Sequence, residues 1–452
     1  MKNAEKTKIN IISLGCPKNL IDSEVMGGFL RQSGHALVDK HTDADLVIIN
    51  TCAFINPAKE EAIDEILTVA EAKKNRPNLR IIVAGCLAQR YGRELLDQIP
   101  EADRVIGTGE VGNIVRHVTE LIRCKNRRKA VITRPVYLMN CNHRRILPAS
   151  AFSTYLKISE GCSNRCSYCV IPSLRGAARS RPPDDILREA ERLAQRGIRE
   201  IIITAQDTTG YGWNLKGRPR LSDLLNDLTQ IKGIEWIRLL YAHPARITAD
   251  LLSTIAENDK ICSYIDLPIQ HIDDAILNAM KRKVNAAEIR QVIAQIRHII
   301  PDVALRTSLI TGFPGETPAR FNRMLDFVRQ TRFDHLGVFT YSREEGTEAA
   351  GLRYHVPEKE KERRRETIMH DQMEISASIN TSLIGSVQEV IIEGKSDRPD
   401  YPYIGRCRRQ APEIDGVTYI KGPSPDIGHI VKCRITAADD YDLFGKIIRK
   451  SS

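Results

Sequence analysis

The chain has 452 residues, 42% of them hydrophobic and 27% charged, a composition typical of globular proteins that excludes a largely disordered chain. This length exceeds what one hydrophobic core serves, so we expect two or three domains, and a net charge of +10 is compatible with a nucleic-acid or ribosomal partner. Eleven cysteines occur with neither a secretory signal nor a membrane-spanning apolar stretch, which argues against a disulfide framework and predicts a cytoplasmic protein with reduced thiols.

The first part of the chain, residues 8–122, is predicted to be an α/β domain. Short β-branched runs alternate with amphipathic stretches: the runs are 8–14, 46–50, 80–84 and 104–106, and the stretches include 18–32 and 58–73. This alternation favours a parallel sheet with helices on both faces. Ligands of such sheets bind beyond the carboxyl ends of the strands, so the residues that follow the strands form the candidate site.

Three cysteines follow three of these strands at the same distance. Cys16, Cys52 and Cys86 each lie about two residues beyond a predicted strand end, so we expect their thiols to converge at one edge of the sheet. We interpret them as ligands of an iron–sulfur cluster with one open iron; the alternative is that they are small buried side chains. The other cysteines show no comparable spacing and are interpreted as buried structural residues: Cys124, Cys141, Cys262, Cys407 and Cys433.

A second set of cysteines, Cys162, Cys166 and Cys169, forms a CxxxCxxC run within one short loop. Three soft thiolates suit an iron–sulfur cluster better than structural zinc, which normally takes a fourth protein ligand. A cluster held by three cysteines keeps one iron free to bind a small molecule, so we expect chemistry at this loop. A zinc knuckle or a pair of redox thiols is the alternative.

Residues 148–378 are predicted to form a partial (βα)6 barrel. A strand–helix unit recurs about six times, with strands expected at 155–159, 201–204, 236–240, 263–267, 303–310 and 335–340. Helices are expected near 183–195, 221–231, 250–257, 286–299 and 318–330. The active sites of such barrels lie at the carboxyl face, in the loops after the strands, and the CxxxCxxC loop follows the first strand.

Polar and glycine-containing segments follow other strands of this barrel. Asp207 comes after the second strand and His271 after the fourth; we interpret the histidine as a hydrogen-bonded structural residue. We predict four cofactor contacts around the carboxyl mouth: Tyr168, Gln206, Gly312 and Glu316. The alternatives are a capping role for Gln206 and a tight turn at Gly312. The charged run 358–366 is interpreted as the solvated face of a helix.

The last segment, residues 381–449, loses the helical pattern and is predicted to be a small antiparallel β-barrel of about five strands. From Ser382 onward the acidic and basic residues nearly balance, which makes the segment a poor phosphate clamp and a protein partner at least as plausible as RNA. A local basic patch of Arg406, Arg408 and Arg409 is expected to meet either kind of partner.

In its overall arrangement the chain resembles the radical S-adenosylmethionine (SAM) methylthiotransferases, which combine a three-cysteine N-terminal domain, a radical SAM barrel and a C-terminal TRAM barrel. The resemblance rests on the segments 13–20, 157–162, 171–176, 179–182, 205–209, 411–416 and 441–445. Segment 17–20, Pro-Lys-Asn-Leu, favours the branch that modifies a protein over the branch that modifies tRNA. Residues 272–274 depart from that branch, where small polar residues are typical.

The resemblance implies two [4Fe-4S] clusters, one on Cys162, Cys166 and Cys169 and an auxiliary one on the other triplet, Cys16, Cys52 and Cys86. At the first cluster SAM would be split to a 5′-deoxyadenosyl radical that takes a hydrogen from the β-carbon of an aspartate in small-subunit ribosomal protein S-twelve. At the auxiliary cluster a sulfur, methylated by a second SAM, would then join that carbon. The protein would supply position and exclusion of solvent.

The resemblance also implies partners: ribosomal protein S-twelve as substrate, a reductant protein such as flavodoxin or ferredoxin, and contact with ribosomal RNA, with no membrane involved. The alternative within the family is a tRNA adenosine methylthiotransferase, for which steeply salt-dependent tRNA binding is expected. An alternative of another class is an iron–sulfur electron carrier or RNA-binding module without turnover, which would form no 5′-deoxyadenosine from SAM.

Overall fold

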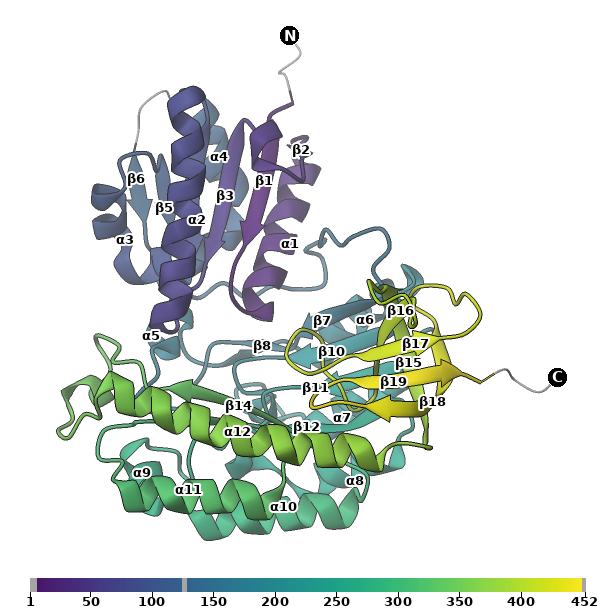
Figure 1. Ribbon diagram of the computed structural model, residues 1–452. Helices are drawn as coiled ribbons and strands as arrows, with labels where there is room; N and C mark the ends of the chain where they lie inside the picture. Colours follow the sequence, from purple (N-terminus) through teal and green to yellow (C-terminus); the bar gives the residue numbers. More distant parts are fainter. Residues whose placement is uncertain (1–5, 124–127, 449–452) are drawn as a thin grey trace.

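The computed structural model describes residues 6–123 and 128–448 (Figure 1). An N-terminal α/β unit lies above a central α/β unit, and a small barrel at the end of the chain packs beside the central one. Cys124 and Arg449 lie outside the described residues. Within the described ranges, no helix is both long enough and apolar enough to cross a bilayer.

The N-terminal unit is built on a parallel sheet of six strands in the order β2-β1-β3-β4-β5-β6. The strands are β1 (Lys8–Ser13), β2 (Ala36–Leu37), β3 (Leu46–Thr51), β4 (Arg80–Gly85), β5 (Arg104–Ile106) and β6 (Lys129–Val131). The helices are α1 (Pro17–Gln32), α2 (Asn56–Asn75), α3 (Cys86–Gln98) and α4 (Ile114–Arg123). Alternate strand side chains pack with α1 and α4 on one face and with α2 and α3 on the other, which confirms the predicted layers.

The central unit contains a second parallel sheet, in the order β14-β13-β12-β11-β10-β7. Its strands are β7 (Ser153–Lys157), β10 (Glu200–Thr204), β11 (Trp236–Leu239), β12 (Ile261–Asp266), β13 (Ala304–Thr311) and β14 (His335–Thr340). The sheet curves without pairing β7 to β14, so the predicted partial barrel is confirmed.

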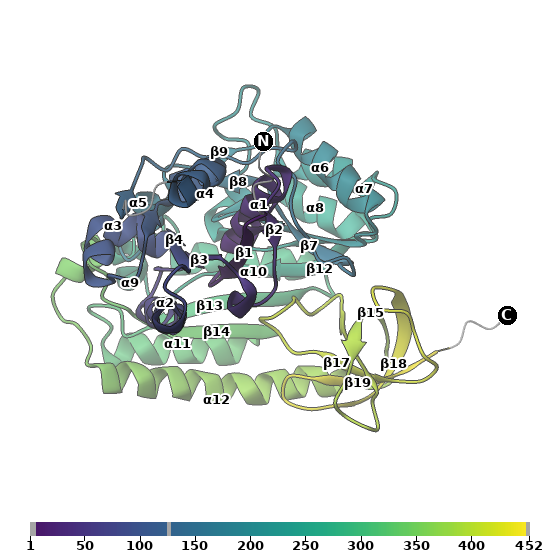
Figure 2. The same ribbon diagram turned by 90° about the horizontal axis from the view of Figure 1, so that it is seen from above.

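Helices cover the outer face of this sheet (Figure 2). They are α6 (Pro183–Gln195), α7 (Leu221–Thr229), α8 (Ala249–Glu257), α9 (Asp274–Ala279), α10 (Ala286–Ile299), α11 (Pro318–Thr331) and the long α12 (Glu358–Ser382). In β10, Ile201 and Ile203 pack with the helices, whereas Ile202 lies in the cluster on the other face. This alternation explains why a strand buried on both sides reads as a continuous apolar run.

Short elements complete the central and N-terminal units. Strands β8 (Ser159–Glu160) and β9 (Arg179–Ser180) pair antiparallel, and helix α5 (Ile171–Arg175) lies between them in the chain. The 3₁₀ turns are η1 (His41–Asp43), η2 (Thr108–Asn113), η3 (Thr208–Gly210), η4 (Pro244–Arg246) and η5 (Glu348–Gly351). The β8–β9 pair closes the base of the loop that carries the CxxxCxxC run.

The C-terminal barrel is closed, in the order β15-β16-β17-β19-β18. Its strands are β15 (Val387–Lys395), β16 (Tyr403–Cys407), β17 (Thr418–Lys421), β18 (Ile430–Ala438) and β19 (Leu443–Ile447). All pairs are antiparallel except β17 with β19, so the predicted small barrel is confirmed with one parallel pair.

The predicted basic patch of this barrel was wrong, because its arginines face the central unit. Arg406 is 1% exposed, and its Nη2 lies 2.6 Å from Oε2 of Glu200. Arg408 donates to the carbonyls of Asp259 and Ile261, at 2.6 and 2.7 Å, and Arg409 pairs with Asp334. These arginines therefore hold the barrel against the starts of strands β10, β12 and β14 of the central sheet.

The charged run 358–366 lies at the start of α12. Its interpretation as the solvated face of a helix is only partly correct. The segment is helical; Arg363 is exposed and Arg365 is half-buried, whereas Lys361 and Arg364 are buried. The Lys361 Nζ donates to the Tyr341 carbonyl at 2.8 Å, and Arg364 pairs with Glu316 at 2.6 Å. One face of α12 therefore carries charged side chains that pack against the central unit.

Candidate functional site

The structure brings Cys16, Cys52 and Cys86 to one edge of the N-terminal sheet, as predicted. Cys16 precedes the first residue of α1, Cys52 directly follows β3, and Cys86 begins α3 after β4. The strands β1, β3 and β4 are parallel neighbours whose ends are in register, with Thr51 opposite Gly85. The three thiols are also close enough for Cys16 and Cys86 to affect the ionisation of Cys52.

Close packing holds this triplet together. Gly15 has φ +86°, and a Cβ there would lie 2.5 Å from the Cys52 Cβ and 2.9 Å from its Sγ. Asn19, in the first turns of α1, donates to the carbonyls of Leu14 and Thr51 at 3.0 and 2.9 Å, and its Oδ1 lies 3.8 Å from the Cys86 Sγ. A single amide therefore links the three cysteine-bearing loops.

Burial sets the ionisation of these thiols. It raises the pKa of Cys52 to about 12, with the neighbouring charges of Cys86 and Cys16 adding to the shift, and it also raises the pKa of Cys86. Such thiols become thiolates when a soft metal displaces the proton. Across 6–123 and 128–448, no three His, Cys, Asp or Glu side chains are gathered tightly enough to hold one metal ion.

The second triplet, Cys162, Cys166 and Cys169, lies in the excursion between β8 and β9. Gly161 has φ +78°, and a Cβ there would lie 2.3 Å from the Ala177 carbonyl oxygen, so the two ends of the excursion touch. The thiols influence one another, and burial is the main cause that raises the pKa of Cys169 to about 12. This loop therefore presents three thiols from a tightly closed segment.

Polar side chains from neighbouring loops of the central unit fix the shape of this loop. Asn164 donates to the Asp207 carboxylate at 2.7 Å and accepts from Arg246 at 2.8 Å, while Arg246 also pairs with Asp207. Arg282 is buried with its Nη1 3.8 Å from the Cys166 Sγ. Within the sequence Arg282 stands in a Lys-Arg-Lys run that resembles a solvated patch, so its place beside a cysteine was not predicted.

Of the predicted cofactor contacts, Tyr168 and Gln206 lie beside this loop. Tyr168 packs against a cluster that contains Phe313, and burial is the main cause that holds its pKa well above the ordinary value. The Gln206 Nε2 donates to the Glu160 carboxylate at 2.8 Å, whereas its Oε1 is buried and has no hydrogen-bond partner among the described residues. An incoming N–H donor would satisfy that oxygen.

The structure places Glu316 and Gly312 in contacts within the chain. Glu316 has a fully buried carboxylate whose Oε1 accepts from the Gly312 N–H at 2.9 Å and from Arg364 at 2.6 Å. Its Oε2 lies 3.0 Å from the His271 Nε2, which agrees with a structural role for that histidine. A Cβ on Gly312 would lie 2.1 Å from the Lys361 Cγ. Glu316 fixes the Gly312 loop, and direct contact of either with a cofactor stays a prediction.

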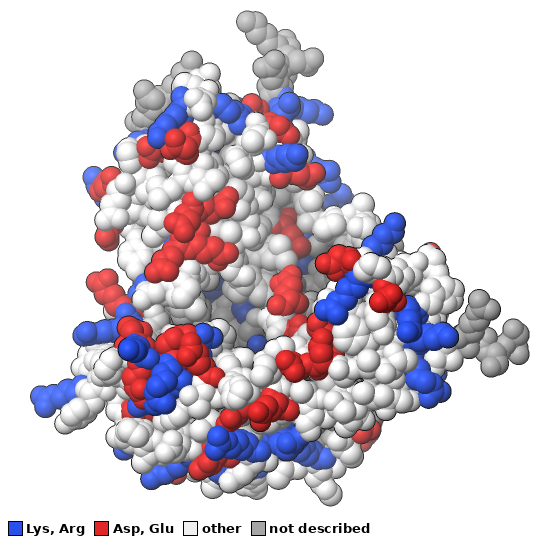
Figure 3. All heavy atoms as spheres, viewed as in Figure 1, with Lys and Arg blue, Asp and Glu red and all other residues white. Residues whose placement is uncertain are grey.

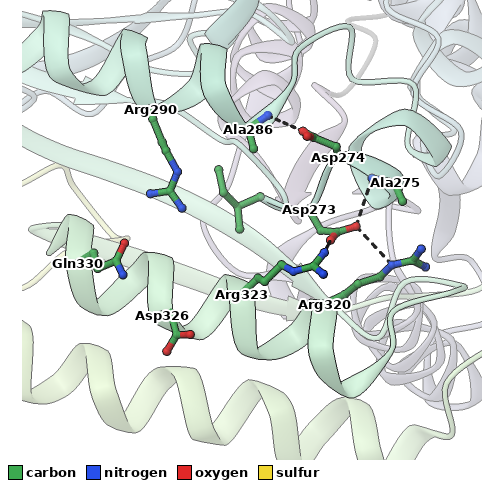
Figure 4. A pocket seen from close by; sticks show the side chains of 10 residues that line it. Asp273, Asp274, Ala275, Ala286, Arg290, Arg320, Arg323, Asp326 and Gln330 are labelled. Atoms are coloured by element: carbon green, nitrogen blue, oxygen red, sulfur yellow. Dashed lines mark hydrogen bonds and ion pairs between the residues drawn. The ribbon is translucent and has the colours of Figure 1, made fainter.

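Residues 272–274, which depart from the expected pattern, line a cavity of about 430 Å³ near α9, α10 and α11 (Figure 4). Asp273 caps α9 by accepting from the Ala275 and Ile276 N–H groups at 3.1 and 3.3 Å, and it pairs with Arg323 at 2.5 Å. None of the predicted site residues lines this cavity. The residues that depart from the expected pattern, 272–274, therefore belong to the N-terminal cap of α9 beside the outer helices, away from the predicted site residues.

The sequence reasoning missed a buried charged group between the two triplets: Asp22, Lys157, Glu160 and Arg175. Lys157 follows the buried residues Tyr155 and Leu156 in β7, and Asp22 lies on the buried face of α1. A charge at a core position signals a partner, since buried charges are paired, but it does not identify that partner.

Three regions of the chain match known families: residues 8–107 match the family described as Uncharacterized protein family UPF0004, residues 156–328 the Radical SAM superfamily, and residues 384–448 the TRAM domain. The ribosomal protein uS12 methylthiotransferase RimO of Syntrophus aciditrophicus is 56% identical over 447 residues, which cover 98% of this chain and 99% of the relative. The chain belongs to the RimO family. The RimO protein of Geobacter sulfurreducens is 48% identical over 99% of this chain and 100% of its own length.

Solved structures show the same fold at low identity. The radical SAM methyltransferase TsrM from Kitasatospora setae, with cobalamin and a [4Fe-4S] cluster bound, has a TM-score of 0.56 and 14% identity, covering 87% of this chain and 82% of TsrM. The cobalamin-dependent radical enzyme OxsB has a TM-score of 0.52 and 11% identity, covering 81% of this chain and 56% of OxsB.

As a RimO-family member, the chain is a radical SAM enzyme that uses SAM and [4Fe-4S] clusters. The residues present fit these groups. Each triplet offers three soft sulfur donors, and the unpartnered Gln206 Oε1 is an acceptor suited to a ligand amine.

Proposed function

We propose that the chain methylthiolates the β-carbon of an aspartate in ribosomal protein uS12. Its substrate class follows from RimO relatives of nearly equal length, and the observation that carries the mechanism is the pair of cysteine triplets in one packed region. Val170 and Leu174, which follow the CxxxCxxC run, lie in the same hydrophobic cluster as Cys86. In addition, the Thr108 hydroxyl donates to the Leu174 carbonyl at 2.6 Å.

In this proposal Cys162, Cys166 and Cys169 hold the cluster that works with SAM, and Cys16, Cys52 and Cys86 hold the auxiliary cluster. When bound, the two clusters and SAM supply radical formation and the methylated sulfur, chemistry that no side chain of the chain can perform. The protein positions the two reaction partners close together, which favours transfer to the substrate over quenching by solvent.

Several side chains of the chain would prepare the SAM site. Gln206 would accept from the amine of SAM through its unpartnered Oε1, while Glu160 fixes the other end of that amide. Tyr168 would close one wall against Phe313 and exclude water. Glu316 would hold the Gly312 loop in place by accepting from the Gly312 N–H, without itself touching the ligand.

The surface suits a basic protein substrate. Figure 3 shows that the molecule is hollowed between the N-terminal unit and the C-terminal barrel, with acidic side chains along the rim. A ribosomal protein carries positive charge to bind RNA, so an acidic rim would attract it. We place this activity in the cytoplasm, where ribosomes are made, with flavodoxin or ferredoxin as the reductant.

Contact with ribosomal RNA is supported by a cluster of aromatic and basic side chains on the C-terminal barrel. Tyr419 stacks on Phe444 with ring centroids 5.4 Å apart, Tyr401 meets Phe444 edge-on at 5.0 Å, and Arg398 lies 4.2 Å above the Tyr419 ring. Lys421 lies 5.1 Å from the Tyr401 centroid. Such rings and cations suit stacking on single-stranded bases, which also keeps tRNA as the alternative substrate.

The test offers both substrates to the anaerobically reconstituted enzyme with SAM and a reductant. One reaction contains isolated uS12 and the other contains unmodified tRNA, and both products are analysed by mass spectrometry. We expect the mass of a methylthio group on an aspartate of uS12. A gain on tRNA alone would assign the chain to the tRNA-modifying branch, and absence of 5′-deoxyadenosine in both reactions would refute turnover.

A further inference from the structure

A buried network of charges joins the N-terminal unit to the central unit between the two cysteine triplets. Lys157 Nζ lies 2.6 Å from the Asp22 Oδ1 and 2.7 Å from the Glu160 Oε2. Arg175 Nη1 lies 2.7 Å from the Asp22 Oδ2 and 3.1 Å from the Glu160 Oε1. All four side chains are at most 6% exposed, and their charges cancel.

The network reaches both triplets through short covalent and hydrogen-bonded links. Glu160 precedes Cys162 by only Gly161, and Arg175 ends helix α5, which begins soon after Cys169. On the other side, Asp22 lies in helix α1, which begins after Cys16. The Arg175 Nη2 donates to the Asn19 Oδ1, the same oxygen that lies 3.8 Å from the Cys86 Sγ.

Arg175 therefore binds Asp22 of the N-terminal unit and Glu160 of the central unit. Unlike Lys157, it also donates to Asn19, whose Oδ1 lies beside Cys86. A guanidinium has donors in a fixed planar fork, so it can bind Asp22, Glu160 and Asn19 at once, which the single ammonium group of lysine cannot reproduce. Bulk solvent screens this charge weakly, because the cavity beside it, lined by Asp22, Glu160 and Arg175 among others, has a volume of about 10 Å³, roughly enough for one water.

We propose that Arg175 is a positioning residue that couples the two cysteine triplets. It fixes α1 and its Cys16 loop against the CxxxCxxC loop, and it places one positive charge beside the auxiliary triplet. The proposal rests on the proposed function, because coupling has a purpose only if a radical made at one triplet meets a sulfur presented at the other.

Two consequences follow from this placement. A fixed positive charge stabilises the more reduced, more negative form of a nearby cluster, so removing it makes the midpoint potential of the auxiliary cluster more negative. If the Cys16 loop and the CxxxCxxC loop are no longer held together, radical formation becomes uncoupled from sulfur transfer, because small misplacements of reacting groups slow the transfer strongly. SAM cleavage then continues while less of it leads to product.

The experiment compares Arg175→Met and Arg175→Lys with a matched control, Arg145→Met. Arg145 is equally buried and also joins α1 to the central unit, through Glu24 at 2.6 Å and Glu189 at 3.0 Å, but none of its ion-pair partners belongs to the network. Each reconstituted holoenzyme is assayed for iron content, for the midpoint potential of each cluster by redox titration, and for 5′-deoxyadenosine formed per methylthiolated uS12.

We expect Arg175→Met to shift the auxiliary potential negative and to raise the ratio of 5′-deoxyadenosine to product about tenfold. Arg175→Lys should keep the potential nearer to that of the unchanged enzyme but still raise the ratio. Arg145→Met should change neither quantity. Equal effects of Arg145→Met and Arg175→Met, or an unchanged ratio and potential in Arg175→Met, would overturn the proposal.

Failure of the proposed function gives a different result, since the unchanged enzyme would then form no methylthiolated uS12. If Arg175→Met cannot be loaded with iron, Asp22→Asn provides the second variant, because it keeps the shape of the side chain and weakens the same bridge. In that variant the ratio should rise while Arg175 and its charge remain; a ratio equal to that of the unchanged enzyme would overturn the proposal.

Discussion

At the scale of single residues, Gly15 controls the auxiliary triplet without having a side chain. Its positive φ, and the 2.5 Å that would separate a Cβ at this position from the Cys52 Cβ, mean that any side chain here displaces the thiol. We predict that Gly15→Ala lowers stability by about 1–3 kcal/mol and prevents loading of the auxiliary cluster. Iron analysis and denaturant unfolding measure these two effects.

Gly34 offers the control for this substitution. It has a similar φ of +93°, but a Cβ there would have nothing within 4 Å. Gly34→Ala should thus show the backbone cost of a left-handed conformation, about 1 kcal/mol, with full iron content. Equal iron loss in both variants would contradict the contact with Cys52 as the cause.

We expect substitutions in the two triplets to affect different steps of the reaction. Cys162→Ala is expected to abolish SAM cleavage, whereas Cys52→Ala should leave cleavage intact and stop sulfur insertion, because only the triplet that contains Cys52 would present the sulfur. Measuring 5′-deoxyadenosine and methylthiolated uS12 side by side tests this. Cys262→Ala is the control, since that thiol is fully buried away from both triplets; a methylthio product from the Cys52 variant would refute the assignment.

The grouping of the six cysteines into two triplets could be predicted because local spacing carries the signal: each of three lies at a strand end, and the other three share one loop. The buried partners Asp22, Arg175 and Arg282 were not predictable in this way. Their neighbours in space lie far away in the chain, so only the folded structure shows that these charges meet.

At the scale of elements, α12 shows how a charged helix can be half buried. Removing Arg364 leaves Glu316 buried with less compensation, so we predict that Arg364→Met destabilises the protein by about 3–5 kcal/mol. Arg363→Met, one residue earlier, breaks an exposed pair with Glu360 and should cost at most about 1 kcal/mol. Urea unfolding distinguishes the two, and similar losses would show that Glu316 does not depend on Arg364.

Most strands were predictable because β-branched runs of five or six residues recur at regular intervals, as in β3 and β4. The buried face of α12 was not, since its residues 358–366 show charge at nearly every position and no apolar stripe. Only contact with the central sheet at Tyr341 and Glu316 decides which of these charges turn inward.

At the scale of the whole molecule, the C-terminal barrel is fixed by Glu200. Burial alone would raise the pKa of Glu200, but the charges of Arg406 and Arg238 outweigh it and hold the pKa at about 2. Because the folded-state pKa lies below the ordinary value of 4.5, this carboxylate stabilises the fold above about pH 4.5 and loses that effect as the pH falls toward 2. The contribution is about 3 kcal/mol.

We predict that Glu200→Gln lowers stability at neutral pH and flattens the dependence of stability on pH between about 5 and 2. Denaturant unfolding across this range measures the difference from the unchanged protein. Glu235→Gln, which breaks a half-exposed pair with Arg199, is the control and should leave the slope unchanged. Equal slopes for Glu200→Gln and the unchanged protein would contradict the assignment.

The docking of the three units was beyond prediction from the sequence. The arginines at 406, 408 and 409 read as a free basic patch because their acceptors, Glu200, Asp334 and the carbonyls near Ile261, are contributed by another unit. The limits proposed for the three domains stay predictions: the central sheet and the barrel lie within them, whereas β6 (Lys129–Val131) of the N-terminal sheet lies beyond residue 122.

The six cysteines divide cleanly between two folded units, and no unit contributes to both sets. In the proposed assignment, each unit would supply a complete set of three thiols, so a cluster on the CxxxCxxC loop would not depend on the loading of Cys16, Cys52 and Cys86. A protein loaded only at the CxxxCxxC loop would then cleave SAM without forming product.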